Sequence, residues 1–374
     1  MTASASAATP DIYASLGRTL VVIDPSPQQR DAIAKLAAAA FRVSDFPEVD
    51  QAVARVNMPP AAIVIGDGAI AADRNQPIQR LRRHPSFARA PIVHFGARPP
   101  AAPLAGTKSD QAPDAHADRG STAVSLIALL SKLGNKTVEA DWIKLPEGPR
   151  AALTNTLGVF KGIPALLQGG EPLKFEAITQ ACTPVLETVR QSGHAYIFEG
   201  LRNHNDIWYV HSLRVATLLA LFGHAIGLDE TSLMTLASAG LVHDMGKTAY
   251  PATLTHKVAT LTPEELKTAH NHVEGTSRYL REHSDAPKAV IMIAEQHHER
   301  LDGSGYPAKL KNGELNDLTR MAAIVDVFAA LTERRPYRAA MAPFQALEVM
   351  QELMRDKLDQ RLVRMFRDLL LKTA

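Results

Sequence analysis

Cysteine is almost absent from this chain of 374 residues, and the single one, Cys182, excludes an intrachain disulfide framework. We expect Cys182 to be a small core residue, since no motif for a nucleophile surrounds it. Sparse cysteine suits a reducing compartment, so we expect a cytoplasmic protein. An excess of one charge is also lacking, because 41 basic and 39 acidic residues give a net charge of +2. That balance offers no electrostatic case for nucleic acid or anionic lipid as the main partner.

Long apolar runs are missing too. No stretch reaches 18 apolar residues, so we expect no membrane span. The first 17 residues are small and polar, without the basic start and apolar stretch of a signal peptide. With 46% hydrophobic and 21% charged residues, the composition is that of an ordinary globular protein, and the length allows two domains.

Short apolar runs alternate with helical patterns over the first 133 residues. The runs 19–23, 61–65 and 90–95 predict strands, and the segments 28–41, 76–83 and 121–133 predict helices. Such alternation is typical of a doubly wound α/β sheet. Residues 98–120 are rich in Pro, Ala, Asp and Gly, which predicts a loop or a frayed element.

This N-terminal region resembles a response-regulator receiver domain. That family holds a divalent cation with an acidic pair after its first strand, and its phosphoacceptor is an aspartate after its third strand. Here Asp24 stands alone before Pro25, and Asp67 lies one place out of register. Gly96 occupies the usual hydroxyl position, and no Lys-Pro pair follows. We therefore predict a degenerate receiver, or pseudo-receiver, that makes protein contacts, with phosphorylation of Asp67 as the alternative.

Helical patterns dominate the remainder. Residues 134–170 have poor periodicity, with several prolines and a Gly-Gly pair, and predict a linker with one helical segment over 150–167. Residues 171–374 predict an all-α domain, in which strand signals vanish. Thr262 and Glu265 form a capping-box pattern around Pro263, and Asp229 is placed to cap another helix after Gly227.

Ten of the 14 histidines lie between His204 and His298, which is where metal or acid-base chemistry is to be sought. Alone, His211 and His272 are more often ordinary helix histidines than ligands. His243-Asp244 is different, because it ends the apolar stretch 236–242, and a buried imidazole-carboxylate pair is costly to desolvate without partners. A divalent metal offsets that cost; structural ion pairing is the alternative.

Two further features point the same way. His297 and His298 are adjacent, and neighbouring helical residues point about 100° apart, so both reach one centre only at a helix end or between them. Asp326 lies in the apolar helical stretch 321–331 and needs a compensating charge there. Mixed nitrogen and oxygen ligands favour iron, manganese, zinc or nickel over magnesium or calcium.

These motifs, in this order, resemble the HD-GYP family of metal-dependent phosphohydrolases. The matching segments are His243-Asp244 with Gly246-Lys247, His297-His298-Glu299, Asp302 to Pro307, Asp326, Ala330-Leu331-Thr332 and Arg335-Pro336-Tyr337-Arg338. The likeness covers residues 171–364. It implies a phosphodiesterase that hydrolyses cyclic di-GMP to the linear dinucleotide pGpG, and often on to GMP.

The resemblance also implies roles for individual residues. Seven would be metal ligands: His211, His243, Asp244, His272, His297, His298 and Asp326. Asp244 would bridge two divalent metal ions, iron first and manganese second. Lys247 would act in catalysis at the scissile phosphate. Gly305, Tyr306 and Pro307 would shape the substrate pocket, and Arg335 and Arg338 would clamp phosphate or guanine.

Departures from the family pattern keep alternatives open. Some members bind a third metal through a glutamate one helical turn before the first histidine, but this chain has Ile207, which favours two metals. Ala329 replaces a usual second aspartate. The alternatives are a catalytically weak cyclic di-GMP sensor or protein-interaction regulator, and a phosphodiesterase for another cyclic dinucleotide such as cyclic GMP-AMP.

Partners and the remaining aromatic residues can be stated briefly. We expect protein partners through the N-terminal domain and a homodimer, with neither nucleic acid nor membrane. Trp142 and Trp208 are expected to be packing or interface residues. Four histidines match no family motif and are expected to be exposed: His204, His256, His270 and His283.

Overall fold

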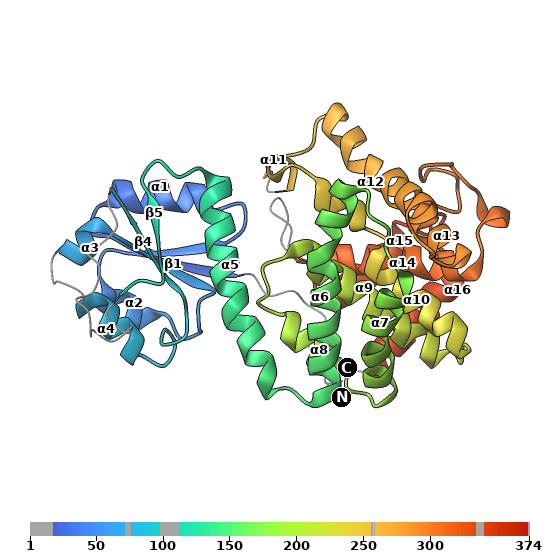
Figure 1. Ribbon diagram of the computed structural model, residues 1–374, viewed down its shortest axis with the longest axis horizontal. Coiled ribbons are helices and arrows are strands. Elements are labelled where there is room, and N and C mark those ends of the chain that lie inside the picture. Colours follow the sequence, from blue (N-terminus) through green and yellow to red (C-terminus); the bar gives the residue numbers. More distant parts are fainter. Residues whose placement is uncertain are drawn as a thin grey trace, which may run out of the picture.

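The computed structural model describes residues 18–71, 76–97, 112–255, 257, 259–333 and 340–372. The chain forms a parallel sheet flanked by helices, followed by a larger all-helical part (Figure 1). Helix α5 (Ala123–Asp141) packs on the sheet with its first turns and runs along the boundary between the two parts.

The sheet has five parallel strands in the order β2-β1-β3-β4-β5. Their bounds are β1 (Thr19–Ile23), β2 (Arg42–Phe46), β3 (Ala62–Gly66), β4 (Ile92–Gly96) and β5 (Ala115–Asp118). Strands β3 and β4 are buried along their whole length, as is nearly all of β1, because helices cover both faces.

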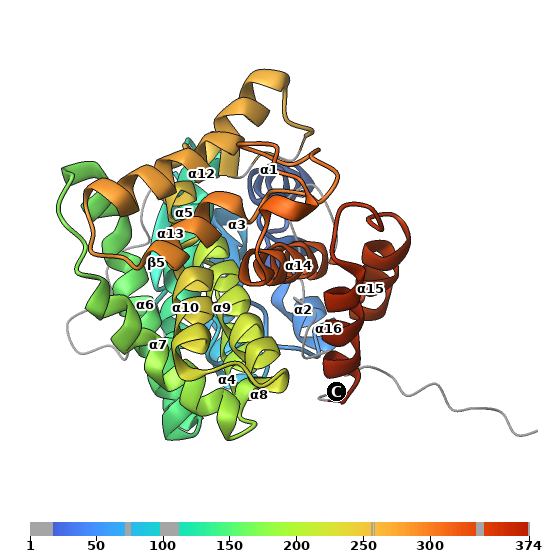
Figure 2. The ribbon, with the colours of Figure 1, turned by 90° about the vertical axis from the view of Figure 1, so that its right-hand side faces the viewer.

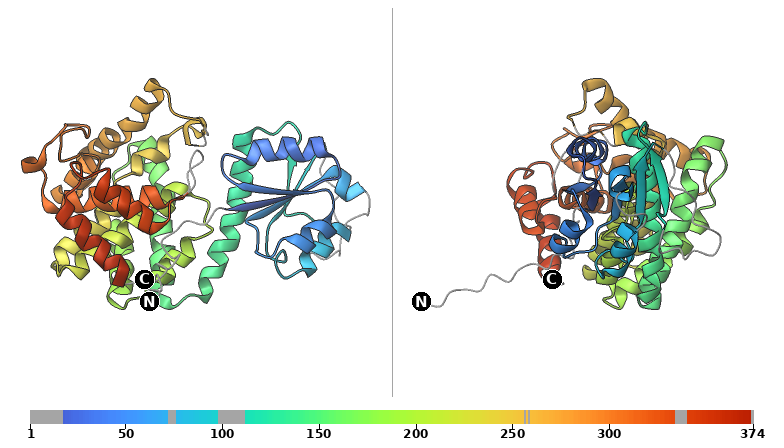
Figure 3. Two further views of the ribbon diagram at one scale, coloured as in Figure 1. Left: turned by 180° about the vertical axis from the view of Figure 1, so that it is seen from behind. Right: turned by 90° about the vertical axis from the view of Figure 1, so that its left-hand side faces the viewer.

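Two helical layers complete this part. Helices α1 (Pro27–Ala37) and α5 cover one face, where Ile33 and Leu130 join the sheet side chains in one core. Helices α2 (Val49–Arg55), α3 (Asp67–Ala71) and α4 (Gln76–Arg83) cover the other face (Figure 3). The doubly wound α/β arrangement expected from the alternating pattern is confirmed; the receiver likeness stays a prediction.

Several elements differ from the sequence expectations. Strand β2 and helix α2 were not predicted, since β2 is a half-buried edge strand with polar residues. Strand β5 lies within residues 98–120, where a loop was expected, whereas 98–111 lie outside the described residues. Helix α1 ends at Ala37 rather than at residue 41, and α5 continues eight residues past 133 to Asp141.

The helical part is built around α9 (Ile207–Ala225), which is buried continuously from Tyr209 to Gly223 (Figure 2). A helix hydrophobic on all sides belongs in the interior of a bundle. The helices around it are α6 (Glu147–Gly169), α7 (Phe175–Arg190), α8 (His194–Leu201), α10 (Glu230–Val242), α12 (Pro263–Glu282), α13 (Lys288–Gln296), α14 (Asp317–Thr332), α15 (Pro343–Glu352) and α16 (Gln360–Lys372). Shorter elements are η3 (Trp142–Lys144), η4 (Met245–Ala249), α11 (Ala252–Thr255) and η5 (Asn312–Glu314).

Local signals in this part are confirmed. Thr262 and Glu265 form the capping box of α12, and Asp229 accepts the Ser232 N–H as the N-cap of α10. Cys182 is fully buried in the core, as expected. Among the described residues, no helix has the length and apolar character needed to cross a membrane.

Helix α6 is longer than the segment expected over 150–167. Its Phe160 and Ile163 belong to the same core cluster as side chains of α7 and α9. The division of the chain at residues 133 and 170 stays a prediction.

Polar contacts join the sheet part to the start of α9. The Arg18 guanidinium donates to the backbone carbonyls of His204 and Asn205, at 2.5 and 3.2 Å. The Asn135 side chain on α5 accepts the Asn205 N–H at 2.5 Å. The next residue, Asp206, is the N-cap of α9. The sheet part therefore contacts the loop that begins the central helix.

Candidate metal centre

The structure brings together all seven side chains that the sequence suggested as metal ligands. They form two groups whose candidate ligand atoms lie within 4.8 Å of one another. Five elements supply them: α9 carries His211, the junction of α10 and η4 carries His243 and Asp244, α12 carries His272, the end of α13 carries His297 and His298, and α14 carries Asp326. Their role as metal ligands stays a proposal.

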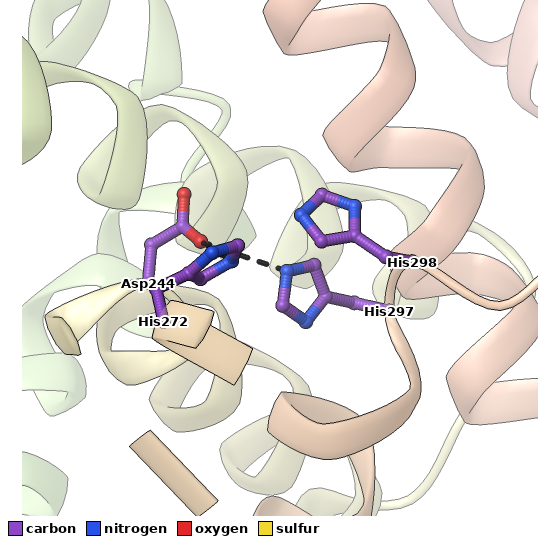
Figure 4. A group of neighbouring side chains, drawn as sticks. All are labelled: Asp244, His272, His297 and His298. Carbon is purple, nitrogen blue, oxygen red and sulfur yellow. Dashed lines mark ion pairs between the residues drawn. The ribbon is translucent and has the colours of Figure 1, made fainter. Parts of the chain in front are cut away.

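The first group consists of Asp244, His272, His297 and His298 (Figure 4). Asp244 Oδ1 lies 3.0 Å from His272 Nε2 and 3.5 Å from His297 Nε2. His297 caps the C-terminus of α13, so the adjacent His298 leaves the helix and its ring lies 4.0 Å from that of His297. The helix end is what lets neighbouring histidines face one centre.

The second group consists of His211, His243, Asp244 and Asp326. His211 Nε2 lies 3.1 Å from Asp326 Oδ1 and 3.4 Å from Asp244 Oδ2. His243 Nε2 lies 3.4 Å from the same Asp244 oxygen. Asp244 thus turns one carboxylate oxygen to each group, which is the geometry of a bridging ligand. Asp326 also faces both, because its Oδ2 lies 3.5 Å from His298 Nδ1.

Close helix packing makes this convergence possible. Gly240, one turn before His243, lies against the α9 backbone, and a Cβ there would fall 2.7 Å from Ala216 N and Cα. A larger residue would separate α9 from α10 and move His211 away from His243. The lack of a side chain at Gly240 is therefore needed for the close approach of the two helices that carry His211 and His243.

Four buried atoms in these groups have no hydrogen-bond partner among the described residues: His243 Nε2, Asp244 Oδ1, His272 Nε2 and His297 Nε2. Buried polar atoms are normally paired, because an unpaired one costs the free energy of its lost hydration. Asp244 Oδ1 and His272 Nε2 lie close together, yet without hydrogen-bond alignment. Lone pairs that converge without pairing fit a divalent transition-metal ion.

The opposite ring nitrogens of three histidines are fixed by the backbone. His243 Nδ1 donates to the Gly240 carbonyl, His272 Nδ1 to that of Ala269 and His297 Nδ1 to that of Ala294, at 2.9, 2.6 and 2.8 Å. A carbonyl oxygen can only accept, so each Nδ1 carries a proton. Nε2 is left as the atom that faces the group, as in metal-binding histidines.

Burial and neighbouring charges divide the imidazoles into two classes. Desolvation lowers the pKa of His297 to about 4, and lowers the pKa values of His272 and His298, so these three are neutral near pH 7. Burial would also lower the pKa of His211, but Glu333, Asp244 and Asp326 outweigh it and raise that pKa to about 10. The pKa of His243 is raised as well, against burial, by Asp244 and Asp326.

Both carboxylates are ionised. Burial alone would raise the pKa values of Asp244 and Asp326, yet the surrounding cations hold both well below the usual range. For Asp244 the largest compensating charge is Lys247, whose ammonium group contacts Oδ2. The centre is thus a buried pair of negative charges beside the Lys247 ammonium group and the imidazole of His211, whose pKa is raised to about 10.

A cavity of about 410 Å³ opens beside the centre. Its polar lining includes Lys247, His272 and His298, and its aromatic lining includes Trp208 and Tyr250. The Lys247 ammonium lies 5.7 Å from the Trp208 ring centroid, within the range of a cation–π contact. Trp208, expected to be a packing or interface residue, instead borders this cavity; Trp142 is a packing residue, with its Nε1–H donating to the Gly200 carbonyl.

Of the Gly305-Tyr306-Pro307 loop, only Tyr306 lines the cavity. Its ring stacks on His270, with centroids 3.8 Å apart and planes at 16°. Gly305 is buried against the Glu299–Arg300 backbone, where a Cβ would meet Arg300 N at 2.4 Å. Its contribution, like that of exposed Pro307, is to shape the loop.

Buried Glu299 holds this loop in place. Its two carboxylate oxygens accept the backbone N–H groups of Ala308 and Leu310, at 2.7 and 3.0 Å. It thus supports the position of Tyr306, a role that the His297-His298-Glu299 motif alone did not reveal.

The remaining predictions have mixed outcomes. Arg335, Arg338 and His256 lie outside the described residues. The expectation that His204 is exposed is wrong: it is 1% exposed and stacks on Trp142. His270 and His283 are half-buried. Ile207 does border the cavity and offers no ligand atom, and Ala329 is fully buried.

Sequence reasoning missed Glu333, which is 4% exposed and lies 3.1 Å from His211 Nδ1. Its spacing could have revealed it. Glu333 follows Asp326 by seven residues, which is close to two helical turns, and it is the C-cap that ends α14.

Asp67, the alternative phosphoacceptor, lies at the carboxyl edge of the sheet. His94 Nε2 lies 2.9 Å from its Oδ1, and its Oδ2 accepts from Ala97 N and the Arg119 guanidinium at 3.1 and 2.8 Å. The basic residue after β5 is therefore Arg119, which contacts Asp67 directly.

Comparison with known proteins supports the assignment of the helical part. Residues 198–362 match the HD domain family model. This segment includes every residue of both candidate ligand groups. A solved HDGYP protein from Bdellovibrio bacteriovorus shares the fold, with a TM-score of 0.50 and 17% identity, over 66% of this chain and 79% of that one.

Three curated relatives are similar in sequence. A cyclic di-GMP phosphodiesterase of Pseudomonas aeruginosa is 32% identical over 152 residues, which is 41% of this chain and 37% of the relative. A 3′3′-cGAMP-specific phosphodiesterase of Vibrio cholerae is 37% identical over 143 residues, 38% of this chain and 33% of the relative. A cyclic di-GMP phosphodiesterase of Thermotoga maritima is 36% identical over 129 residues, 34% of this chain and 35% of the relative. The chain spans about a third of the length of each.

Proposed function

We propose that this chain is a phosphodiesterase that hydrolyses cyclic di-GMP to the linear dinucleotide pGpG with two divalent metal ions. The observation that carries this proposal is the pair of ligand groups that share Asp244 and contain unpartnered buried atoms. Iron is the first candidate and manganese the second, since both accept mixed imidazole and carboxylate ligands. The similarity to curated phosphodiesterases supports the substrate class.

The metals, when bound, would activate water and offset charge on phosphate oxygens. The residues of the chain have separate tasks. Asp244 and Asp326 present oxygens to both groups, so each could hold both ions. Lys247 belongs both to the cavity lining and to the Asp244 contact. It is thus placed to pair with a phosphate oxygen of a substrate in the cavity and to offset its developing negative charge.

The cavity suits a ligand with phosphates and aromatic bases. Trp208, Tyr250 and Tyr306 border it, and stacking of a base on an aromatic ring contributes about 1–3 kcal/mol. In this proposal Gly305 and Pro307 shape the Tyr306 loop. Arg335 and Arg338 would hold phosphate or guanine, on the strength of their sequence motif alone.

The chain organisation belongs to the proposal as well. We assign residues 1–133 to a pseudo-receiver, 134–170 to a connecting segment with helix α6, and 171–374 to an HD-GYP domain. The strand order β2-β1-β3-β4-β5 supports the first assignment, because it is a common order among doubly wound folds. Protein partners and a homodimer would use the N-terminal part.

Cyclic GMP-AMP is a second candidate substrate. The relative from Vibrio cholerae that is specific for 3′3′-cGAMP is 37% identical, against 32% for the cyclic di-GMP enzyme of Pseudomonas aeruginosa. Both substrates share the phosphodiester ring and differ in one base. Discrimination would come from base contacts in the cavity.

The test is to purify the chain anaerobically, measure its metal content and follow turnover of both dinucleotides by chromatography. We expect close to two metal equivalents and faster hydrolysis of cyclic di-GMP. Asp244→Asn should lower the metal content and reduce turnover on the order of 10³-fold, since metal-ion stabilisation contributes several kcal/mol. Asp368→Asn, on the exposed side of α16, is the matched control.

Three outcomes would change the proposal. Full metal occupancy with dinucleotide binding but no hydrolysis would replace the enzyme by the sensor. Faster turnover of cyclic GMP-AMP would replace the substrate. A metal content that is unchanged in Asp244→Asn would contradict the proposed centre.

A further inference from the structure

His211 differs from three other histidines of the centre in what fixes its ring. The Nδ1 atoms of His243, His272 and His297 donate to backbone carbonyls three residues earlier in their own segments. His211 Nδ1 instead lies 3.1 and 3.3 Å from the two carboxylate oxygens of Glu333, 122 residues away in sequence. The ring of His211 is therefore oriented by a distant side chain, whereas the rings of the other three are oriented by nearby backbone carbonyls.

We propose that Glu333 is a positioning residue for the metal centre: it accepts the Nδ1 proton of His211 and thereby aims Nε2 at the space between Asp244 and Asp326, where these residues would hold a metal ion. This inference rests on the proposed function. Carboxylate–histidine–metal arrangements of this kind fix the ring orientation and increase the basicity of the ligand.

The surroundings of Glu333 hold its carboxylate in place. Arg214, 5% exposed, has its Nε 3.5 Å from Glu333 Oε1 and donates through another nitrogen to Thr332 Oγ1 at 2.9 Å. Since Arg214 and His211 are three residues apart on α9, one face of this helix presents both to Glu333. A buried carboxylate is tolerable only with such partners.

The position of Glu333 in its helix also favours a specific role. It is the C-cap of α14, where the helix dipole makes a negative charge unfavourable by about 0.3–1 kcal/mol. Burial adds to that cost. The contacts to His211 and Arg214 offset the helix-dipole cost and the burial cost, and so stabilise the Glu333 carboxylate at this helix end.

Helix α14 and its C-cap residue thereby contact both ring nitrogens of one imidazole. Asp326 approaches His211 Nε2 at 3.1 Å, and Glu333, two turns later, approaches Nδ1 at 3.1 Å. Rotation of the ring would break both contacts at once. Glu333 is not among the residues that line the cavity, whereas it contacts His211 directly.

The test compares Glu333→Ala and Glu333→Gln with the wild-type chain, after removal of metal by chelator. Binding of added Mn²⁺, and of Fe²⁺ under anaerobic conditions, is measured by competition with a chromogenic chelator. We expect Glu333→Ala to weaken affinity about 10–100-fold, as is typical when the partner of a metal-binding histidine is removed. Glu333→Gln should lose less, because its amide oxygen still accepts from Nδ1.

Glu295→Gln is the matched control, because Glu295 carries the same charge on α13 but pairs with Arg281 at the surface. Its metal affinity should equal that of the wild-type chain. In the metal-loaded protein we expect Glu333→Gln to lower kcat with little change in KM, since Glu333 does not contact the cavity.

A purely structural role gives a different result. It would lower the unfolding temperature of the metal-free chain and leave the metal affinity of Glu333→Ala within about twofold of wild type, which would overturn the inference. If the wild-type chain binds metal but hydrolyses neither dinucleotide, the proposed activity fails while the Glu333 result still stands. A wild-type chain that binds neither Mn²⁺ nor Fe²⁺ overturns both.

Discussion

The molecule contains two clusters of histidine and carboxylate, one in each part, and they differ in how they are satisfied. At the edge of the sheet, both carboxylate oxygens of Asp67 have hydrogen-bond partners, which are His94, the Ala97 N–H and Arg119. In the helical part, Asp244 Oδ1 has no hydrogen-bond partner among the described residues, although His272 Nε2 lies 3.0 Å away. Both clusters contain histidine and aspartate, but the aspartate oxygens are paired in the sheet cluster and one is unpaired in the helical cluster.

The difference indicates which cluster needs a ligand. A set of polar groups that satisfy one another, with the Asp67 side chain 34% exposed, is complete without an ion. A set of fully buried lone pairs that converge without pairing is costly until a cation occupies the space between them. The two clusters could not be separated by residue type or by sequence spacing, and the following predictions test the separation.

The largest effect concerns protons in the metal-free chain. The pKa of His297 falls from 6.5 to about 4 on burial, so between these values the unfolded chain binds a proton that the folded chain does not. The stability from His297 is therefore complete above pH 6.5 and is lost as pH falls towards 4, by up to about 3 kcal/mol. Urea unfolding with a chelator present, from pH 7 to 4.5, measures this loss.

The comparison variant is His297→Gln, whose amide does not titrate in this range. Its free energy of unfolding should fall less steeply with decreasing pH than that of the wild-type chain. The slope for His211→Gln should change in the other direction and at higher pH, because its pKa is raised to about 10 and its stability is lost as pH rises from 6.5. Equal slopes for His297→Gln and wild type would contradict the assignment of His297 as a neutral, buried imidazole.

A second prediction concerns a buried carboxylate that is satisfied. Glu299 is 1% exposed, and its oxygens accept from Ala308 N and Leu310 N. In Glu299→Gln, the amide NH₂ would face one of these donors, at a cost of about 1–3 kcal/mol in unfolding free energy. We expect unchanged metal content and a higher KM, because the loop carries Tyr306. A fall in metal content instead would show that a buried carboxylate can belong to the metal centre even when its oxygens have hydrogen-bond partners.

Much of the fold could be predicted where the hydrophobic pattern was strong. Strand β1 and helix α4 have the predicted bounds, because one is a continuous apolar run and the other buries Ile78 and Leu81 at helical spacing. Strands β2 and β5 were missed, since each lies at an edge of the sheet and has few buried side chains. Edge strands are defined by pairing with a neighbour, which a local pattern does not contain.

The site divides in the same way. The seven candidate ligands could be proposed from dipeptides and family motifs, each of which is local in sequence. Glu333 was missed, because its partners His211 and Arg214 lie more than a hundred residues earlier and its seven-residue spacing from Asp326 was the one local signal. The sequence also did not show which cluster has its hydrogen bonds satisfied, since that depends on the direction of the lone pairs. The candidate ligands could thus be read from the sequence, whereas their hydrogen bonding depends on how the helices pack.

The smallest effect is expected at the sheet edge. Asp67→Asn removes the charge that meets Arg119, whose side chain is 50% exposed, and such partly exposed pairs contribute up to about 1 kcal/mol. The Ala97 N–H keeps an acceptor in the asparagine oxygen. We therefore expect a small loss of unfolding free energy, with metal content and dinucleotide turnover unchanged. Asp45→Asn, which breaks the exposed pair with Arg30, is the matched control. A loss of bound metal in Asp67→Asn but not in Asp45→Asn would show that the sheet cluster also holds an ion, and the contrast between the two parts would fail.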